Sequence, residues 1–463
     1  MNKRVASLVL MLGLGALASS PSFALSEEAA GNGVPSLAPM LEEVTPAVVI
    51  ISTARTSAVP ESLRFLDEED MRRFFNDPSA APGQNRQPSV RGAGSGVIVD
   101  ADKGYVVTNH HVIDKADVIT VSLQDGREFT AKLLGSDAST DVALLQIEAE
   151  NLQELPFANI EDLRVGDYVV AVGNPFGLGQ TVTQGIVSAL GRSGLNNDNY
   201  EDFIQTDAAI NMGNSGGALV DLEGRLIGIN TAIISGTGTN AGIAFAVPVD
   251  MIASVMTHLE RDGEVRRGQL GVQIQDLNAA MEQALQTGAG KGALVTSVLP
   301  GSAAEAAGIQ ASDVIVEVDG RRIDSGRELR NLIGLMRRDQ EVQLLVYRDG
   351  QAQRISAVVG GGQPAVAANT QDSGRALADP VYQGAQLRSL DQVVGAQRGV
   401  EVVNVEQGSP AWQAGLRPGD VIYEVNRSEV ATLQEFNQRV DADAPVTALS
   451  VLRENRRMLV IMS

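Results

Sequence analysis

One nine-residue segment occurs twice in the C-terminal half of the chain. Gly301 to Ile309 (GSAAEAAGI) matches Gly408 to Leu416 (GSPAWQAGL) at an offset of 107 residues, from 301 to 408. Asp313-Val314-Ile315 matches Asp420-Val421-Ile422 at the same offset, from 313 to 420. A solenoid needs more copies at a shorter period. The repeat therefore predicts two similar domains in this half of the chain.

The repeat also divides the rest of the sequence. We expect one domain over residues 25–262, the first copy over 263–360 and the second copy over 380–463. Residues 361–379 are rich in Gly, Ala and Gln, which is typical of a linker. A chain of 463 residues exceeds what one hydrophobic core usually serves, so about three domains are expected on size alone.

The N-terminus has the pattern of a secretory signal peptide over residues 1–24. Lys3 and Arg4 precede a short apolar run, and Ser22-Phe23-Ala24 forms a small-x-small cleavage site. This predicts that the chain is exported. No later stretch has eighteen unbroken apolar residues, so we expect no transmembrane segment in the mature chain.

Charge and cysteine content exclude several classes of function. The formal net charge is −21, which repels phosphate backbones and argues against nucleic acid as a partner. The chain has no cysteine, so disulfides, cysteine nucleophiles and thiolate metal sites are excluded.

The region from Gly92 to Val249 consists of short β-rich runs separated by turn residues. Examples are Gly96 to Val99, Asp117 to Val121, Tyr168 to Val172 and Leu226 to Ile229. Runs of this length without intervening helical patterns predict a barrel or a sandwich. A further strand is expected at Ala47 to Ile51, and the apolar spacing after Pro248 predicts a helix that closes the domain.

A glycine-rich turn, Gly213-Asn214-Ser215-Gly216-Gly217, carries a candidate serine nucleophile. The histidine base must be one of three, His110, His111 or His258. An α/β-hydrolase elbow would require a histidine after the serine. Only His258 follows it, and the pattern places that residue on a helix surface.

The order histidine, aspartate, serine fits better. Thr108-x-x-His111 ends one β-run, Asp141-x-x-Leu144 begins another, and Ser215 follows. These segments resemble those of chymotrypsin-like proteases. The similarity to the HtrA/Deg family is closer, because it extends through the further segments Gly166-Asp167, Gly173 to Gly177, Gln205 to Asn211 and Gly242 to Ala246. The implied fold is mainly β, a chymotrypsin-like double β-barrel protease domain followed by two PDZ domains.

The resemblance implies a role for each site residue. His111 is the general base, Asp141 orients it and Ser215 attacks, while the backbone N–H groups of Gly213, Asn214 and Ser215 form the oxyanion hole. Asn214 stands where digestive relatives carry an aspartate that helps lock the active conformation, which is compatible with a switchable site. Neither a metal nor an organic cofactor is implied. We expect His110 and His111, as neighbours on an extended strand, to point to opposite faces, so they would not readily chelate one metal ion.

The resemblance also places a specificity pocket near the serine. Its expected residues are Ala209, Ile210, Asn211, Thr231, Ala232 and Ile233. None is a carboxylate that could hold Lys or Arg. A small or medium aliphatic residue before the scissile bond is therefore predicted.

The first repeat opens on a loop that resembles the carboxylate-binding loop of PDZ domains. The loop consists of Gly268, Gln269, Leu270, Gly271 and Val272. Backbone N–H groups of such a loop hold a peptide C-terminus while the peptide adds a strand to the sheet. The second copy has Gly384 to Leu387 at the comparable place and departs more from the pattern, so packing within an oligomer is as well supported there as peptide binding.

The family resemblance implies an ATP-independent endopeptidase of the periplasm that degrades unfolded or damaged envelope proteins, with possible chaperone activity. We expect its activity to be regulated by peptide C-termini that bind to the PDZ domains and by assembly into a homo-oligomer built from trimers. A long insertion over residues 57–92 would reach a neighbouring subunit through Phe74 and Phe75. The alternatives are a signalling protease that cuts one membrane-anchored regulator and a protein that mainly binds peptides as a chaperone.

Overall fold

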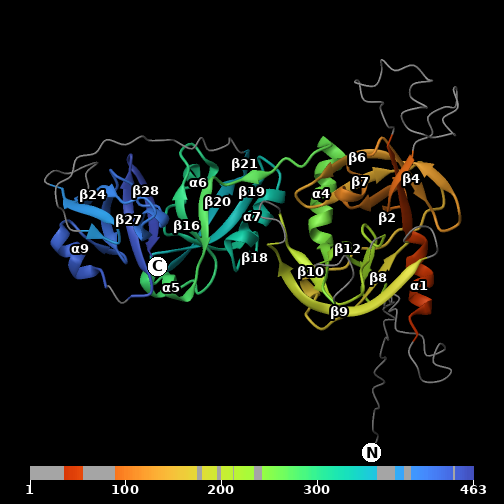
Figure 1. The fold of residues 1–463 in the computed structure, drawn as a ribbon, viewed down its shortest axis with the longest axis horizontal. Helices are drawn as coiled ribbons and strands as arrows, with labels where there is room; N and C mark the ends of the chain where they lie inside the picture. The colour runs from red at the N-terminus through yellow and green to blue at the C-terminus, as the bar shows by residue number, and fades with distance from the viewer. Residues whose placement is uncertain are drawn as a thin grey trace, which may run out of the picture.

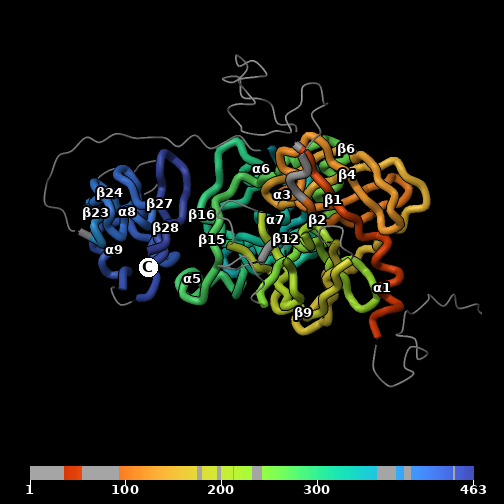
Figure 2. The backbone as a smooth tube through the Cα atoms, turned by 45° about the vertical axis from the view of Figure 1, so that its right-hand side comes forward, coloured from red at the N-terminus to blue at the C-terminus, as the bar shows by residue number. Residues whose placement is uncertain are grey.

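The computed structural model describes residues 36–55, 89–174, 180–194, 200–211, 213–233, 242–361, 381–390, 398–441 and 444–462. The expected signal peptide, residues 57–88 of the expected insertion with Phe74 and Phe75, and nearly all of the expected linker lie outside these ranges. The molecule is elongated, with an N-terminal unit at one end and the two repeats in a row beside it (Figures 1 and 2).

The N-terminal unit is built from two β structures. One is a seven-stranded antiparallel sheet with the order β5-β4-β1-β2-β3-β7-β6, and the other is a closed six-stranded barrel with the order β10-β13-β12-β11-β8-β9. The sheet strands are β1 (Val48–Arg55), β2 (Ser89–Asp100), β3 (Tyr105–Thr108), β4 (Val118–Ser122), β5 (Glu128–Thr130), β6 (Lys132–Asp137) and β7 (Val142–Gln146). The barrel strands are β8 (Tyr168–Gly173), β9 (Thr181–Arg192), β10 (Phe203–Thr206), β11 (Ala218–Val220), β12 (Leu226–Ile233) and β13 (Ala244–Pro248).

Short helices connect and cover these strands. They are α1 (Ala38–Val44), the 3-10 turn η2 (Thr45–Ala47), α3 (His110–Ile113), the 3-10 turn η4 (Ile160–Asp162) and α4 (Val249–Asp262). The sequence placed His110 and His111 on an extended strand, and this was wrong. The chain leaves β3 through Asn109 and turns at once into the four-residue helix α3.

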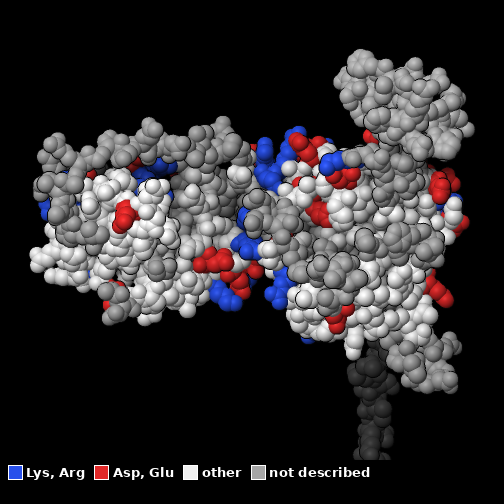
Figure 3. Space-filling model, viewed as in Figure 1, with Lys and Arg blue, Asp and Glu red and all other residues white. Residues whose placement is uncertain are grey.

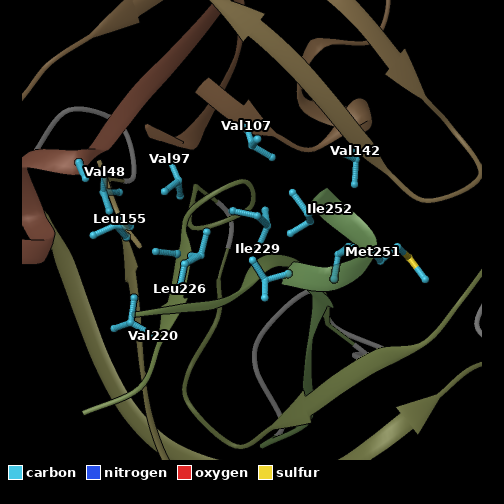
Figure 4. Packing of buried hydrophobic residues seen from close by; sticks show 14 of the residues in the cluster. Val48, Val97, Val107, Val142, Leu155, Val220, Leu226, Ile229, Met251 and Ile252 are labelled. Atoms are coloured by element: carbon cyan, nitrogen blue, oxygen red, sulfur yellow. The ribbon is translucent and has the colours of Figure 1, made fainter. Parts of the chain in front are cut away.

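The core of the N-terminal unit lies between the sheet and the barrel. Figure 4 shows Val97 and Val107 of the sheet facing Leu226 and Ile229 of the barrel, with Ile252 of α4 closing the space. All five side chains are almost completely buried. Because the site residues come from loops between these packed strands, the core fixes where those loops meet.

The two repeats share one continuous sheet. β16 (Ala293–Val298) of the first repeat pairs with β28 (Arg456–Met462) of the second through Ser297 and Met458. The first repeat also contains β14 (Gly268–Gln269), β15 (Val272–Asp276), α5 (Ala279–Leu285), α6 (Ala303–Ala306), β17 (Val314–Val318), β18 (Arg321–Arg322), α7 (Gly326–Leu335), β19 (Glu341–Arg348), β20 (Gln351–Val358) and β21 (Gly360–Gly361). The second contains β22 (Val381–Tyr382), β23 (Ala385–Ser389), β24 (Val400–Val405), α8 (Pro410–Gln413), β25 (Val421–Val425), β26 (Ser428–Glu429), α9 (Leu433–Arg439) and β27 (Thr447–Arg453).

The repeated residues have the same structural role in both copies. Ser302 and Ser409 cap α6 and α8, each accepting a hydrogen bond from the N–H three residues later. The repeated aspartates, Asp313 and Asp420, are buried and each accepts two hydrogen bonds from one arginine guanidinium, that of Arg348 or Arg453. A buried carboxylate needs such a partner.

The first repeat packs against the N-terminal unit through α7 and α4. His258 was expected on a helix surface, but it is 2% exposed because α7 covers that face of α4. Its Nε2 donates to Leu335 O over 3.0 Å. Of the helices in the described ranges, none is long and apolar enough to cross a membrane.

Candidate active site

His111 and Asp141 form a hydrogen-bonded pair at the junction of sheet and barrel. His111 Nδ1 lies 2.7 Å from Asp141 Oδ2 and 3.0 Å from Oδ1, and the His111 N–H also donates to Oδ1 over 3.0 Å. An ionised carboxylate only accepts, so the proton sits on Nδ1. The other ring nitrogen, Nε2, is thereby left as the proton acceptor.

Asp141 is held by groups from two segments, residues 109–111 and Thr231. Its carbonyl accepts hydrogen bonds from the N–H of His110 and from Asn109 Nδ2, and its Oδ2 accepts from Thr231 Oγ1 over 2.5 Å. Burial alone raises the pKa of Asp141, but the hydrogen bonds and charge of His111 and the hydroxyl of Thr231 outweigh it, so this pKa lies below its usual value. The carboxylate is therefore charged at neutral pH.

Some backbone N–H groups of the turn around Ser215 donate hydrogen bonds to described residues, and others do not. Asn214 N donates to Asn211 O, Gly216 N to Asn230 O and Gly217 N to Asn214 O. No described residue accepts a hydrogen bond from the N–H of Gly213 or Ser215. An oxyanion hole needs donors of this kind. Of the three expected donors, Gly213 and Ser215 are available, whereas the N–H of Asn214 is used within the turn.

The Ser215 hydroxyl does not point at the histidine. Its Oγ donates to the Thr231 carbonyl over 3.2 Å, so the hydroxyl must rotate before its proton can reach His111. The side chain of Asn214 is 1% exposed, and its Oδ1 accepts no hydrogen bond from the described residues. Being uncharged, Asn214 cannot form the ion pair that an aspartate could offer at this position.

The expected pocket residues lie on both sides of the turn. Ile210 is buried, Asn211 is exposed, and the Ala209 carbonyl accepts a hydrogen bond from Thr183 Oγ1 over 2.8 Å. Thr231 is buried with its hydroxyl on Asp141, a contact that no sequence motif indicates. The side chains of Ala232 and Ile233 are outside the described residues.

The loop of residues 268–272 in the first repeat has the form of an anion cradle. Gly271 has φ +80°, and a Cβ there would lie 2.3 Å from Ser302 Cβ, so only glycine fits. The carbonyls of Leu270 and Gly271 accept hydrogen bonds from Ala304 and Leu299, while no described residue accepts from their N–H groups. β15 pairs with β16 along one edge and lies beside α7 along the other.

The second repeat has the same loop but a covered edge. Gly384 has φ +92°, and its Cβ position is blocked by Ser409 Cβ at 2.2 Å. Here β22 pairs with the outer edge of β23, through Val381 with Gln386 and Tyr382 with Ala385. The Tyr382 ring packs edge-on against Phe436 of α9, with centroids 5.3 Å apart. The chain itself thus pairs with the first two residues of the edge to which a peptide strand would add.

A cavity lies away from this chemistry, between α4 and the first repeat. It is open to solvent, has a volume of about 350 Å³ and is lined by both parts of the molecule, including Asp202, Asp250, His258, Arg321 and Glu328. Burial and the charge of Asp250 raise the pKa of Asp202 to about 6, with a further contribution from Glu328 and an opposing one from Arg321. His258 has its place here and takes no part in the histidine–aspartate pair.

Comparison with known protein families covers all three parts. Residues 94–229 match the trypsin-like peptidase domain, and residues 268–359 and 401–453 each match a PDZ domain. The periplasmic serine endoprotease DegP of Escherichia coli is 43% identical over 476 residues, covering 98% of both chains. A probable periplasmic serine protease do/HhoA-like of Haemophilus influenzae is 44% identical and covers 96% of this chain and 94% of that one.

Solved structures give the same assignment. An HtrA-type protease, AlgW with decapeptide, has a TM-score of 0.53 at 41% identity and covers 71% of this chain and 99% of its own. AlgW with tripeptide has a TM-score of 0.55 at 40% identity, covering 71% of this chain and 98% of its own. The predicted fold class is confirmed, a mostly β protein with a trypsin-like protease domain followed by two PDZ domains.

Proposed function

The chain belongs to the HtrA/Deg family of serine proteases and is a serine endopeptidase, and we propose that it degrades unfolded or damaged proteins in the periplasm without ATP. The observation that carries the residue assignment is the pairing of His111 with Asp141 next to a serine turn in which two N–H groups have no acceptor among the described residues. The names of the relatives support the periplasmic location.

The geometry supports the following sequence of steps. A bound peptide displaces the Ser215 hydroxyl from Thr231 O, and Ser215 Oγ attacks the scissile carbonyl as its proton passes to His111 Nε2. Asp141 stabilises the imidazolium that forms. The N–H groups of Gly213 and Ser215 bind the developing oxyanion, and His111 then protonates the leaving amine.

The test is a Ser215→Ala variant beside a Ser122→Ala variant. Both remove one hydroxyl, but Ser122 donates to Glu128 on a distant strand pair. We expect Ser215→Ala to lose cleavage of unfolded casein and covalent labelling by a fluorophosphonate, and Ser122→Ala to keep both. Equal cleavage by wild type and Ser215→Ala would refute the assignment.

The first PDZ domain is the proposed peptide sensor. Its loop N–H groups lie next to an edge of β15 that no described strand covers, and this arrangement suits a terminal carboxylate. The similar HtrA-type protease AlgW is known in complex with a decapeptide. Exposed C-termini of unfolded or newly cut chains are the proposed ligands of the first PDZ domain, because in the second PDZ domain β22 already pairs with the edge of β23.

A homo-oligomer built from trimers, and chaperone activity, complete the proposal. Both are tested by the mass of the Ser215→Ala protein, measured by light scattering with and without an unfolded substrate. We expect a multiple of three chains that grows when substrate is added. A monomer under both conditions would overturn this part of the proposal.

A further inference from the structure

A buried serine outside the proposed triad contacts the nucleophile turn at two points. Ser95 lies on β2 and is 0% exposed. Its N–H donates to Ser215 O over 2.8 Å, and its Oγ donates to Gly213 O over 2.7 Å. One residue therefore holds the carbonyls on both sides of Asn214.

The direction of the Ser95 hydroxyl proton follows from its neighbours. The N–H of Asn174 donates to Ser95 Oγ over 2.8 Å, so Oγ is the acceptor in that contact. The Gly213 carbonyl can only accept. The hydroxyl proton therefore points at Gly213 O, and the chain of bonds from Asn174 through Ser95 to Gly213 polarises in one direction.

Gly213 needs an external support of this kind. Its φ of +98° is a conformation open to glycine, and glycine moves freely between such states. The peptide unit between Gly213 and Asn214 is held at its N–H by Asn211 O and at its carbonyl by Ser95 Oγ. With that plane fixed, the remaining N–H groups of Gly213 and Ser215 keep their direction.

The strand and the turn approach too closely for side chains. A Cβ on Gly216 would lie 2.0 Å from Ser95 O, and one on Gly94 would lie 2.7 Å from Val112 Cγ1 and 3.2 Å from Ser215 O. Ser95 O also accepts from Thr108 Oγ1 over 2.7 Å. β2 is thus fixed to β3 on one side and to the turn on the other, which makes it a rigid base for the clamp.

We propose that Ser95 is a positioning residue, whose hydroxyl holds the oxyanion-binding N–H groups in their active direction. This rests on the proposed roles of Ser215 and Gly213. Ser95 touches neither the substrate nor the reacting atoms. Its loss therefore weakens binding of the transition state and leaves binding of the ground-state peptide unchanged.

The experiment compares Ser95→Ala with Ser297→Ala in the full chain. Ser297 is also a buried serine whose hydroxyl donates one hydrogen bond, to Gln273 Oε1 in the first PDZ domain. For Ser95→Ala we expect kcat on a chromogenic peptide to fall roughly 10- to 100-fold, with KM changed less than about twofold. The inhibition constant of a peptide boronic acid, which forms a tetrahedral adduct, should rise by a similar factor. Ser297→Ala should leave all three values unchanged.

Three results would overturn the proposal: a kcat for Ser95→Ala within twofold of wild type, a loss confined to KM, or an equal loss in Ser297→Ala. Ser95→Cys, which keeps the size and a weak donor, gives the answer if Ser95→Ala does not fold. It should show an intermediate loss of kcat at unchanged KM, and an unchanged kcat would count against the clamp. Failure of the triad itself is distinguishable, because Ser215→Ala would then still cleave.

Discussion

At the scale of single residues, Asp141 combines an unusual backbone conformation with several hydrogen bonds. Its backbone φ is +56°, in a region that residues other than glycine seldom occupy and that recurs at functional sites. The N–H of His110 and the amide of Asn109 hold its carbonyl, which fixes the residue in this state. The carboxylate is thereby aimed at the His111 ring.

Replacing Asp141 by Asn tests that role. An amide can present its NH₂ to His111 Nδ1, which moves the ring proton to Nε2 and removes the base. We expect kcat/KM to fall roughly 10³- to 10⁴-fold, as in other triads, with the fold intact. Peptide hydrolysis at pH 7 measures the first and circular dichroism the second.

Asp114→Asn is the matched control. It removes an exposed carboxylate that ends α3, beside His111 but outside the pair. Its kcat/KM should stay within about twofold of wild type, because an exposed charge is screened by solvent. Comparable losses in both variants would assign the effect to local charge instead of proton placement.

The sequence predicted the candidates His111, Asp141 and Ser215 because histidine is rare in this chain and all three residues stand in specific motifs. It contained no sign of the contacts of Ser95 or of the Thr231 hydroxyl, since neither residue stands in such a catalytic motif. Their partners, Gly213 and Asp141, lie 118 and 90 residues away, so only the packing of sheet on barrel reveals the contacts. His258 was misplaced for a similar reason, because a helix pattern does not show that a second domain will cover the polar face.

At the scale of elements, the two PDZ copies share their caps and buried ion pairs, and they differ at one strand edge. The 107-residue offset predicted the similarity. Neither the pairing of β16 with β28 nor that of β22 with β23 could be read from it, because any strand edge offers the same backbone groups. In the second copy Gln383 and Gly384, with φ +49° and +92°, form the tight turn that folds β22 onto β23.

A matched glycine pair tests which copy binds peptides. Gly271→Ala and Gly384→Ala introduce the same strain, since each new Cβ meets a capping serine. We expect Gly271→Ala to weaken binding of a peptide with an apolar C-terminus at least about tenfold, because the loop N–H groups lose their alignment. Calorimetric titration of wild type should give one peptide per chain.

Gly384→Ala should leave that affinity unchanged, because the backbone of β22 already pairs with the edge of β23 in this copy. Two peptides per wild-type chain, or equal weakening by both variants, would contradict the assignment. Differential scanning calorimetry on both variants confirms that each domain is folded during the titration.

At the scale of the whole molecule, the protease domain and the first PDZ domain are joined by polar contacts. Asn331 Nδ2 donates to Glu201 O over 2.8 Å, and the Tyr200 ring centroid lies 4.1 Å from the guanidinium carbon of Arg267 and 5.3 Å from that of Arg330. Figure 3 shows charged side chains of both signs on the two sides of this junction. Because carboxylates line this junction, we expect the stability of the molecule to depend on pH.

Asp202 makes that dependence measurable. Its pKa of about 6 in the folded protein lies above the value of an exposed aspartate, so the folded state binds more protons between about pH 4 and 6. Stability therefore falls as the pH rises through this window and stays lower above it. Asp202→Asn does not titrate. It should unfold at the same temperature as wild type near pH 4 and at a higher temperature above pH 6. Above pH 6 its free energy of unfolding should exceed that of wild type by about 1–2 kcal/mol, after allowance for partial exposure.

Thermal unfolding from pH 4 to 8, followed by calorimetry, measures the difference. Glu148→Gln, at an exposed position, should follow the wild-type curve throughout. Asp250, Arg321, Glu328 and His258 line the same cavity in both proteins, so the comparison isolates the change at position 202. A difference that is constant across this range, or one that grows toward pH 4, would show that the Asp202 carboxylate is not strained by its burial between the two domains.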